Sequence, residues 1–395
     1  MKKRFPLRFL ATCPRGAEKL LLSELKELGL SGLHLARGGV RFDGELAHGF
    51  RAGLWSRLAH RVLLHLRRFP AVGADDLYSG VQTFDWDDVL TEHTTFAVHT
   101  LGTTQSLRHT HFTSLKVKDA IVDQIRARRG VRPSVDRNDP VVRVVVHLDR
   151  GHCAISLDLI GVSLHRRGYR VREGDAPLRE TLAATLVRWS NWDRGEPYID
   201  PMCGSGTLVI EAAMLAMDRA PGRGLMPAAT RWPLFTDADL LWAELCEEAD
   251  ARAKAICPAM IWASDRDRRA LAACRANLRA AGIEEAVTLI EGEATDLSLP
   301  QGPGLILANP PYGERMMGDG RAATILRAFG DTLESHLGFR AVIFSGHPEM
   351  ESHIPAEAIR RIRLFNGPIP CQALEFAAPG SKASGKRRGG GSRSR

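Results

Sequence analysis

Cysteine pairs are missing from this 395-residue sequence. Its seven cysteines are scattered, and no two of them form a Cys-x-x-Cys pair. Zinc sites and disulfide frameworks need closer or denser cysteines, so neither is expected. The sequence therefore predicts a protein without a bound metal in a reducing cytoplasm.

Long hydrophobic runs are missing as well. No apolar stretch approaches the roughly 20 residues that a membrane-spanning helix requires. The basic N-terminal segment has only a short, interrupted apolar stretch, so we expect no signal peptide, anchor or membrane partner. With 44% apolar and 25% charged residues, the composition is that of a globular protein long enough for two or three domains.

Acidic residues are scarce in two parts of the chain, whose net charge is +8. Residues 102–172 contain 14 Lys and Arg against 6 Asp, and residues 381–395 contain 6 Lys and Arg without any acid. The internal asymmetry favours a polyanionic partner such as nucleic acid. The tail is better explained as a disordered, solubilising segment.

The front half predicts two α+β units. In residues 1–58, an amphipathic helix over 15–28 is flanked by strands over 7–11 and 39–42. In the following unit we expect strands over 95–100, 141–148 and 153–159, a helix over 114–129, and the basic loop HRRGYR at 165–170. These elements are typical of a nucleic-acid-binding platform, although a purely structural module would have the same pattern.

From residue 176 onward, strands alternate with helices, which predicts a parallel, doubly wound sheet. We expect strands over 198–200, 261–264, 287–290, 305–308 and 341–344, and helices over 178–189, 207–217, 268–281 and 322–336. An insertion with an extra helix is expected between Pro221 and Pro258. Residues 362–365 and 372–376 flank a turn and predict a closing antiparallel strand.

The glycine-rich sequence YIDPMCGSGT at 198–207 lacks the features of two common nucleotide sites. It is not G-x-G-x-x-G and no P-loop Lys follows, which argues against a dinucleotide or a triphosphate. Gly204 and Gly206 would let the backbone approach a ligand closely. Asp200 suits a ligand with a positive or hydrogen-donating group, but a tight turn without a ligand explains the motif equally well.

Acids follow the next two expected strands. Asp265 in ASDRD stands where an acid can bind ribose hydroxyls, although a helix N-cap explains it as well. Glu293 in EGEATD could accept a hydrogen bond from an adenine amino group, with Asp296 as the alternative. A polar surface turn would also account for this motif.

The fourth strand end carries Asn309-Pro310-Pro311-Tyr312. Prolines end a strand because they lack an N–H and fix φ. The Asn309 side-chain oxygen and the Pro310 carbonyl could accept both N–H bonds of an exocyclic amino group and aim its nitrogen at an electrophile. Tyr312 could stack on a flipped base. Four such strand ends in order are a stronger signal than any one alone.

With these four strand-end motifs in this order, the segment resembles the class I S-adenosylmethionine-dependent methyltransferases that modify amino groups of adenine, cytosine, guanine or glutamine. More closely, the chain resembles the 23S ribosomal RNA guanine-N2 methyltransferases of the L type, including their THUMP RNA-binding domain. The segments that carry this resemblance are LWSRLAHRV (54–62), KVKDAIVD (116–123), VDRNDPVVRV (135–144), LHRRGYR (164–170), APLRETLAA (176–184), DPMCGSGTLVIEAAMLA (200–216) and NPPYGER (309–315).

The resemblance extends to about residue 378 and implies an α/β fold. A ferredoxin-like α+β domain (1–58) and a THUMP domain (59–168) would precede a methyltransferase domain with a Rossmann-like doubly wound sheet (169–380) and a disordered basic tail (381–395). Some relatives are fused to a second methyltransferase that makes 7-methylguanine; we expect no such half here. Glu293 replaces a frequent Asp of the family, and because a carboxylate is kept, its adenine contact should survive.

The resemblance also implies roles for individual residues. S-adenosylmethionine would be bound by Thr181, Asp200, Cys203, Gly204, Gly206, Asp265, Glu293, Asp296 and Asn309. Catalysis would depend on Asn309 and Pro310, which orient guanine N2, and on Tyr312, which packs on the base. RNA phosphates would be bound by Lys116, Lys118, Arg126, Arg128, Arg129, Arg166, Arg167 and Arg170.

The expected function is methyl transfer to N2 of a specific guanine in 23S ribosomal RNA, either free or in an early large-subunit precursor. A tRNA guanine-N2 methyltransferase shares THUMP and Asn-Pro-Pro-Tyr and remains an alternative. The basic front half argues against a protein glutamine methyltransferase. A non-catalytic RNA-binding ribosome-assembly factor is another alternative, against which the intact Asn309 and Gly204 count.

Overall fold

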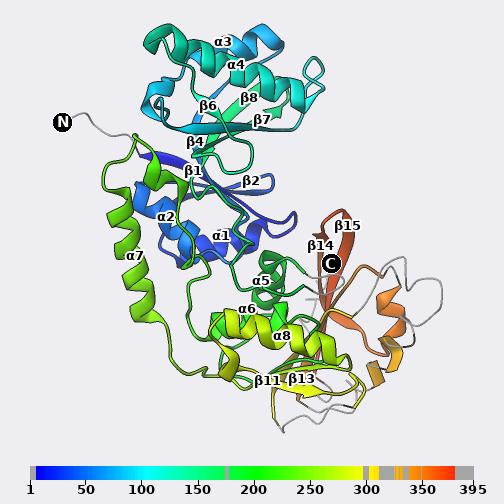
Figure 1. Ribbon diagram of the computed structural model, residues 1–395. Helices are drawn as coiled ribbons and strands as arrows, with labels where there is room; N and C mark the ends of the chain where they lie inside the picture. The colour runs from blue at the N-terminus through cyan, green and yellow to red at the C-terminus, as the bar shows by residue number, and fades with distance from the viewer. Residues whose placement is uncertain are drawn as a thin grey trace, which may run out of the picture.

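The computed structural model describes residues 6–173, 178–296, 302–310, 324, 326–328, 330, 331, 338–347 and 349–378. Two β-sheets with helices packed on them organise this part of the chain (Figure 1). The expected α/β fold is confirmed. No helix of the described ranges is both long and apolar enough to cross a membrane.

The first sheet has eight strands in the order β2-β3-β1-β4-β8-β7-β5-β6. Its N-terminal part contains β1 (Leu7–Thr12), α1 (Glu18–Glu27), β2 (Ser31–Ala36), β3 (Gly39–Gly44) and α2 (Leu46–Trp55). Its second part contains α3 (Ala74–Gln82), β5 (Thr95–Leu101), α4 (Thr110–Arg129), β6 (Ser134–Val135), β7 (Val142–Asp149) and β8 (His152–Asp158). The strands and helices expected in this half are confirmed, with ends shifted by a few residues.

Strand β4 (Arg61–Pro70) joins the two parts and was not expected from the sequence. Its early residues pair antiparallel with β1, where Leu64 lies opposite Phe9. Its later residues pair antiparallel with β8, where Phe69 lies opposite Cys153. Because one ten-residue strand pairs on both sides, backbone hydrogen bonding continues from the N-terminal unit into the next one.

The second sheet has seven strands in the order β11-β10-β9-β12-β13-β15-β14. The parallel strands are β9 (Tyr198–Asp200), β10 (Ile261–Asp265), β11 (Thr288–Glu291), β12 (Gly304–Ala308) and β13 (Phe339–Ser345). The expected closing strand is confirmed as part of an antiparallel hairpin of β14 (Ala358–Asn366) and β15 (Ile369–Phe376). The helix expected over 322–336 lies largely outside the described residues.

The order of these strands locates the ligand-binding edge. From β9 the chain moves outward to β11 and then returns to β12 on the other side of β9. Open α/β sheets bind ligands at such a switch point, outside the carboxyl ends of the strands. The helices between the strands are α5 (Glu180–Trp189), α6 (Thr207–Ala216), α7 (Ala238–Arg252) and α8 (Arg268–Ala280).

Helix α7, the extra helix expected between Pro221 and Pro258, packs against α2 of the front half (Figure 1). Trp242 on α7 contacts Phe50 edge-on, with ring centres 5.5 Å apart. The buried Trp232 donates its indole N–H to the Val141 carbonyl at 3.0 Å. This insertion therefore fastens the second half of the chain to the first sheet.

Replacing Trp232 by Ala should destabilise the protein by about 3–5 kcal/mol, because a large buried side chain is lost. Trp232→Phe keeps most of the apolar volume and leaves the Val141 carbonyl without its donor, so a loss of about 1–3 kcal/mol is expected. Urea unfolding of both variants measures the difference. Equal losses would show that packing of the indole contributes nothing beyond its hydrogen bond.

Candidate active site

The glycine loop 201–206 connects β9 to α6. Gly204 and Gly206 have φ values of +55° and +86°, in the left-handed region that favours glycine. A Cβ on Gly204 would meet no atom of the described residues within 4 Å, whereas a Cβ on Gly206 would lie 2.4 Å from the Cys274 sulfur. Gly204 therefore leaves the loop backbone open to a ligand, and Gly206 allows α6 to pack against α8.

Asp200 ends β9 and is 1% exposed. Its Oδ1 accepts a hydrogen bond from the Met202 N–H at 3.2 Å. Burial raises the pKa of Asp200 to about 8, with a smaller lowering by the Met202 N–H and a further rise from the charge of Asp265. A cationic or hydrogen-donating ligand would stabilise the ionised form of this carboxyl group.

Asp265 ends β10 and holds the glycine loop. Its Oδ2 accepts from the Gly204 N–H at 2.9 Å, and its Oδ1 accepts from the Asp267 N–H at 3.0 Å. The N-cap of α8 is Asp267, whose side chain accepts from the Arg269 N–H. The alternative interpretation of Asp265 as the helix N-cap is therefore wrong.

Glu293 and Asp296 follow β11, and both are exposed. Glu293 lies 3.8 Å from the guanidinium group of Arg266. The Gly292 N–H donates to the Asp265 carbonyl at 3.2 Å, which holds this turn beside the end of β10. Both carboxylates are thus accessible to a ligand at this edge.

Asn309 directly follows β12. Its side-chain Oδ1 is buried and has no hydrogen-bond partner among the described residues. A buried acceptor without a donor costs about 1–3 kcal/mol, so this oxygen is suited to receive an N–H from a ligand. Pro310 is buried beside it, and Tyr312 lies outside the described residues.

Parallel pairing brings the four strand ends to one edge of the sheet. Strand β10 pairs with both β11 and β9, and β9 pairs with β12 through Ile199 opposite Ile306. Asn309 lies three positions beyond Ile306, so it leaves the sheet next to the loop after Asp200. In sheet order, the edge presents Glu293, Asp265, Asp200 with the glycine loop, and Asn309.

Cys203, within the glycine loop, has internal partners. Its N–H donates to the Ser264 carbonyl at 2.9 Å, and its side chain is almost buried. The hydrogen bond with Cys274, followed by burial, raises the pKa of the Cys203 thiol well above its usual value. The residue therefore lines the loop as a neutral thiol.

Thr181 on α5 is fully buried, and its hydroxyl lies 3.0 Å from Nδ1 of His60. Burial, with a smaller contribution from nearby cations, lowers the pKa of His60 to about 4, so this imidazole is neutral at pH 7. Thr181 thus connects α5 to the front half. Its contact with the cofactor stays a prediction.

Two predicted RNA-binding residues at the end of α4 are paired with acids. Nη1 of Arg128 lies 2.5 Å from Asp85 and 3.2 Å from Asp87. Nε of Arg129 lies 2.5 Å from Asp87. All four side chains are at least partly exposed, so these pairs are screened by solvent and can exchange for phosphate.

The other predicted RNA-binding cations of α4 differ in their partners. The ammonium group of Lys116 lies 4.8 Å from the centre of the Tyr78 ring, and that of Lys118 lies 2.7 Å from Asp119. Arg126 is exposed and has no ion pair within the described part of the chain. These residues are distributed around α4, in the second part of the front half.

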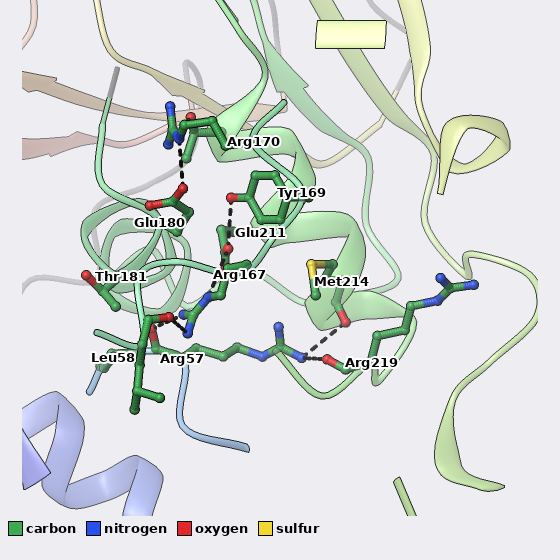
Figure 2. Close-up of polar contacts among 12 residues, drawn as sticks. Arg57, Leu58, Arg167, Tyr169, Arg170, Glu180, Thr181, Glu211, Met214 and Arg219 are labelled. Carbon is green, nitrogen blue, oxygen red and sulfur yellow. Dashed lines mark hydrogen bonds and ion pairs between the residues drawn. The ribbon is translucent and has the colours of Figure 1, made fainter. Parts of the chain in front are cut away.

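The three arginines of the basic loop 165–170 differ in exposure. Arg166 is exposed, whereas Arg167 and Arg170 point inward (Figure 2). The Arg167 side chain is 1% exposed and donates to the Arg57 carbonyl at 2.6 Å. The Arg170 side chain is 14% exposed and forms an ion pair with Glu180 at 2.8 Å. The prediction that Arg167 and Arg170 bind RNA is corrected, because both guanidinium groups are committed to the interior.

Glu211 on α6 is a buried residue that the sequence analysis missed. Its Oε1 accepts from the Tyr169 hydroxyl at 3.0 Å and lies 3.5 Å from Nε of Arg167 (Figure 2). Burial raises the pKa of Glu211, against the lowering by nearby arginines. A single Glu within the otherwise apolar helix TLVIEAAMLA was the available signal.

Arg57 is a second missed residue, and it joins the front half to the far end of α6. Its Nη2 donates to the carbonyls of Met214 at 3.1 Å and Arg219 at 2.6 Å (Figure 2). Its backbone N–H donates to Oε1 of Glu24 at 3.0 Å. Burial lowers the pKa of Arg57 to about 10, so it remains charged at pH 7 and complements the carbonyl end of the helix.

Asn277 on α8 is the third buried residue that was not expected from the sequence. Its Nδ2 donates to the carbonyls of Ser205 and Arg172, each at 2.9 Å. Its Oδ1 accepts from the N–H groups of Val171 and Arg172, each at 3.0 Å. A polar residue beside Cys274 and Leu278 on the buried face of α8 was the sequence signal.

Fold and site together are those of a methyltransferase. The family model described as "RMKL-like, methyltransferase domain" matches residues 167–375, and the chain belongs to this family. Models of the THUMP domain and of the RlmL ferredoxin-like domain match residues 72–158 and 8–63. The resemblance inferred from the sequence is confirmed.

The chain is 40% identical over 403 residues to the "Ribosomal RNA large subunit methyltransferase K/L" of Pseudomonas putida (strain W619), and equally so to that of Pseudomonas entomophila (strain L48). Each match covers 98% of this chain and 54% of the relative, so the chain spans about half the length of these relatives. Among solved structures, SMU.472 in complex with SAH has a TM-score of 0.87 and 30% identity, covering 97% of this chain and 100% of that one. A possible methylase from Clostridium difficile 630 has a TM-score of 0.88 and 26% identity, covering 96% and 100%.

Gly206→Ala should destabilise the protein more than Gly204→Ala. Both substitutions incur the left-handed backbone cost of about 1–2 kcal/mol, but only the first also brings a methyl group against Cys274. Adding Cys274→Ala to Gly206→Ala should recover part of the loss, measured as the thermal midpoint. A double variant no more stable than Gly206→Ala would mean that backbone strain alone explains the effect.

The pKa of Asp200 predicts a pH dependence of stability. Its folded-state pKa of about 8 exceeds the ordinary 3.8, so between these pH values the folded state holds a proton that the unfolded state has released. The stability of the ligand-free protein should therefore fall as pH rises from about 4 to about 8. Asp200→Asn should flatten this slope in urea unfolding at pH 5 and pH 8; parallel slopes would contradict the assignment.

Proposed function

We propose that this protein transfers a methyl group from S-adenosylmethionine to the exocyclic N2 of a guanine in 23S ribosomal RNA. The proposal rests on the buried Oδ1 of Asn309, which has no partner in the described part of the chain and lies at the switch point of the sheet, next to the glycine loop. Membership of the RMKL-like methyltransferase family and the names of the ribosomal RNA methyltransferase relatives support it.

The described residues fit the proposed cofactor, which supplies an electrophilic methyl group on a sulfonium. The space above Gly204 leaves the loop backbone open to it. The Asp200 carboxyl group, with its raised pKa, gains from a cationic group such as an ammonium. Asp265 keeps lone pairs for ribose hydroxyls, and the exposed Glu293 can accept from the adenine amino group, with Asp296 as the alternative.

Asn309 and Pro310 would orient the target amine. The Asn309 Oδ1 and the Pro310 carbonyl would each accept one N–H of the guanine amino group, which aims its nitrogen at the methyl carbon. Because this amine has little basicity, alignment should contribute more than a general base. We include Tyr312 in the proposal as the ring that packs on the extruded base.

The exposed and half-buried cations of α4 and the basic loop would hold the RNA. We assign this role to Lys116, Lys118, Arg126 and Arg166, and to Arg128 and Arg129 after exchange of their aspartate partners. Such phosphate contacts position the RNA without reading its sequence, and they weaken as salt rises. The partner would be ribosomal RNA or an early large-subunit precursor, which places the protein in the cytoplasm.

Asn309→Ala should lower methyl transfer by at least about 10²–10³-fold, the loss typical when one aligning hydrogen-bond group is removed from an active site. Cofactor affinity, measured by calorimetry, should remain close to that of the wild type, because the glycine loop and the strand-end acids are intact. Turnover at the wild-type rate in this variant would refute the assignment of the site.

The RNA target requires its own measurement. Purified, unmodified 23S ribosomal RNA and tRNA are incubated separately with the protein and cofactor, and the nucleosides are analysed by mass spectrometry. We expect 2-methylguanosine in ribosomal RNA only. Methylation of tRNA alone would replace the proposed substrate, and methylation of neither RNA, with normal cofactor binding, would favour a precursor particle as the substrate.

A further inference from the structure

The inward-pointing Arg170 contacts Glu180 (Figure 2) and also the start of α6, which follows the glycine loop of the proposed cofactor site. Its Nε forms an ion pair with Glu180 at the start of α5, and its Nη2 donates to the Leu178 carbonyl at 2.6 Å. The same Nη2 donates to the Thr207 hydroxyl at 3.2 Å. Thr207 directly follows Gly206, so one guanidinium group connects the start of α5 to the end of the glycine loop.

A second contact joins the same stretch of chain to this loop. Asn277 accepts from the N–H groups of Val171 and Arg172, the two residues after Arg170, and donates to the Ser205 carbonyl. Residues 170–172 are therefore attached to both sides of Gly206, at Ser205 through Asn277 and at Thr207 through Arg170. They form part of the loop's support, although they belong to the basic segment of the sequence.

The position of Arg170 is unfavourable for the folding free energy, which argues against a role in stability alone. A positive charge at the first turn of α6 opposes the helix dipole. Its Nη1 is buried and has no hydrogen-bond partner in the described residues. A buried ion pair such as Arg170–Glu180 can often be replaced as a whole by apolar groups without loss of stability, which favours a role in shaping the site.

We propose that Arg170 is a positioning residue for methyl transfer, which fixes the glycine loop through the Thr207 hydroxyl and does not bind RNA. This inference rests on the proposed function, because it assigns the loop to S-adenosylmethionine. Within the same basic hexapeptide, Arg166 faces solvent and keeps the RNA-binding role. The hexapeptide thus serves two different ligands from its two faces.

The test compares Arg170→Gln with Arg166→Gln in the full chain. Arg170→Gln should raise the Kd for S-adenosylmethionine about tenfold, equivalent to about 1.4 kcal/mol, and leave the Kd for 23S ribosomal RNA unchanged. Arg166→Gln should weaken RNA binding and leave cofactor affinity unchanged. The opposite result, with RNA affinity lost in Arg170→Gln and cofactor affinity retained, would overturn the proposal.

A second pair of variants guards against misfolding, because Arg170→Gln leaves the buried Glu180 unpaired. Thr207→Val removes only the hydroxyl that Arg170 contacts, and Thr207→Ser keeps it. We expect Thr207→Val to raise the KM for the cofactor several-fold, with the KM for RNA unchanged, and Thr207→Ser to behave like the wild type. Equal cofactor KM values in Val and Ser variants would overturn the role of this contact.

A binding measurement on the wild-type protein distinguishes failure of this inference from failure of the proposed function. Calorimetry with S-adenosylmethionine should show binding. Absence of binding would refute the proposed cofactor and the inference together. Normal wild-type binding, with unchanged cofactor affinity in both Arg170→Gln and Thr207→Val, would refute the inference alone and leave the proposed function standing.

Discussion

The site depends on the parallel pairing of β9 with β12. These strands are far apart in the sequence, yet their pairing sets the glycine loop after Asp200 beside Asn309. Among the described residues, the backbone at Gly204 is open and the side-chain oxygen of Asn309 is an acceptor without a donor. A donor of a methyl group and an amine that receives it need such adjacent positions, because alignment accounts for much of the rate of a transfer between two bound molecules.

Helix α6 connects this edge of the second sheet to the front half of the molecule. It begins at the glycine loop, and residues from the front half or the linker contact it at Thr207, at Glu211 and beyond Met214 (Figure 2). The charged groups involved are buried. Their desolvation costs free energy, which is compensated only when their hydrogen bonds and ion pairs have good geometry. The first sheet is continuous from the N-terminal unit to the unit that contains α4, and the contacts to α6 join it to the second sheet.

Much of the second sheet could be predicted, because each strand there is a short apolar run that ends at a distinctive polar motif. The strand ends carrying Asp200, Asp265 and Asn309 were located correctly for this reason. Strand β4 was missed, since LHLRRF mixes apolar and basic residues and gains its strand character from two neighbours. The inward direction of Arg167 and Arg170 was missed for a related reason: a cationic side chain in a basic loop is ordinarily solvated, and only its partners Glu211 and Glu180 reverse that preference.

The sequence alone determined the fold class, the family and the residues at the strand ends, because apolar periodicity and short motifs are local properties of the chain. Only the tertiary structure decided which of those residues meet, which cations face solvent and which contact the glycine loop or the helix that follows it. Burial and hydrogen bonding depend on segments distant in sequence. Asn277, for example, forms four hydrogen bonds that reach both residues 171–172 and the glycine loop. A side chain's chemistry is encoded at its own position, but its role is set by the groups that folding places around it.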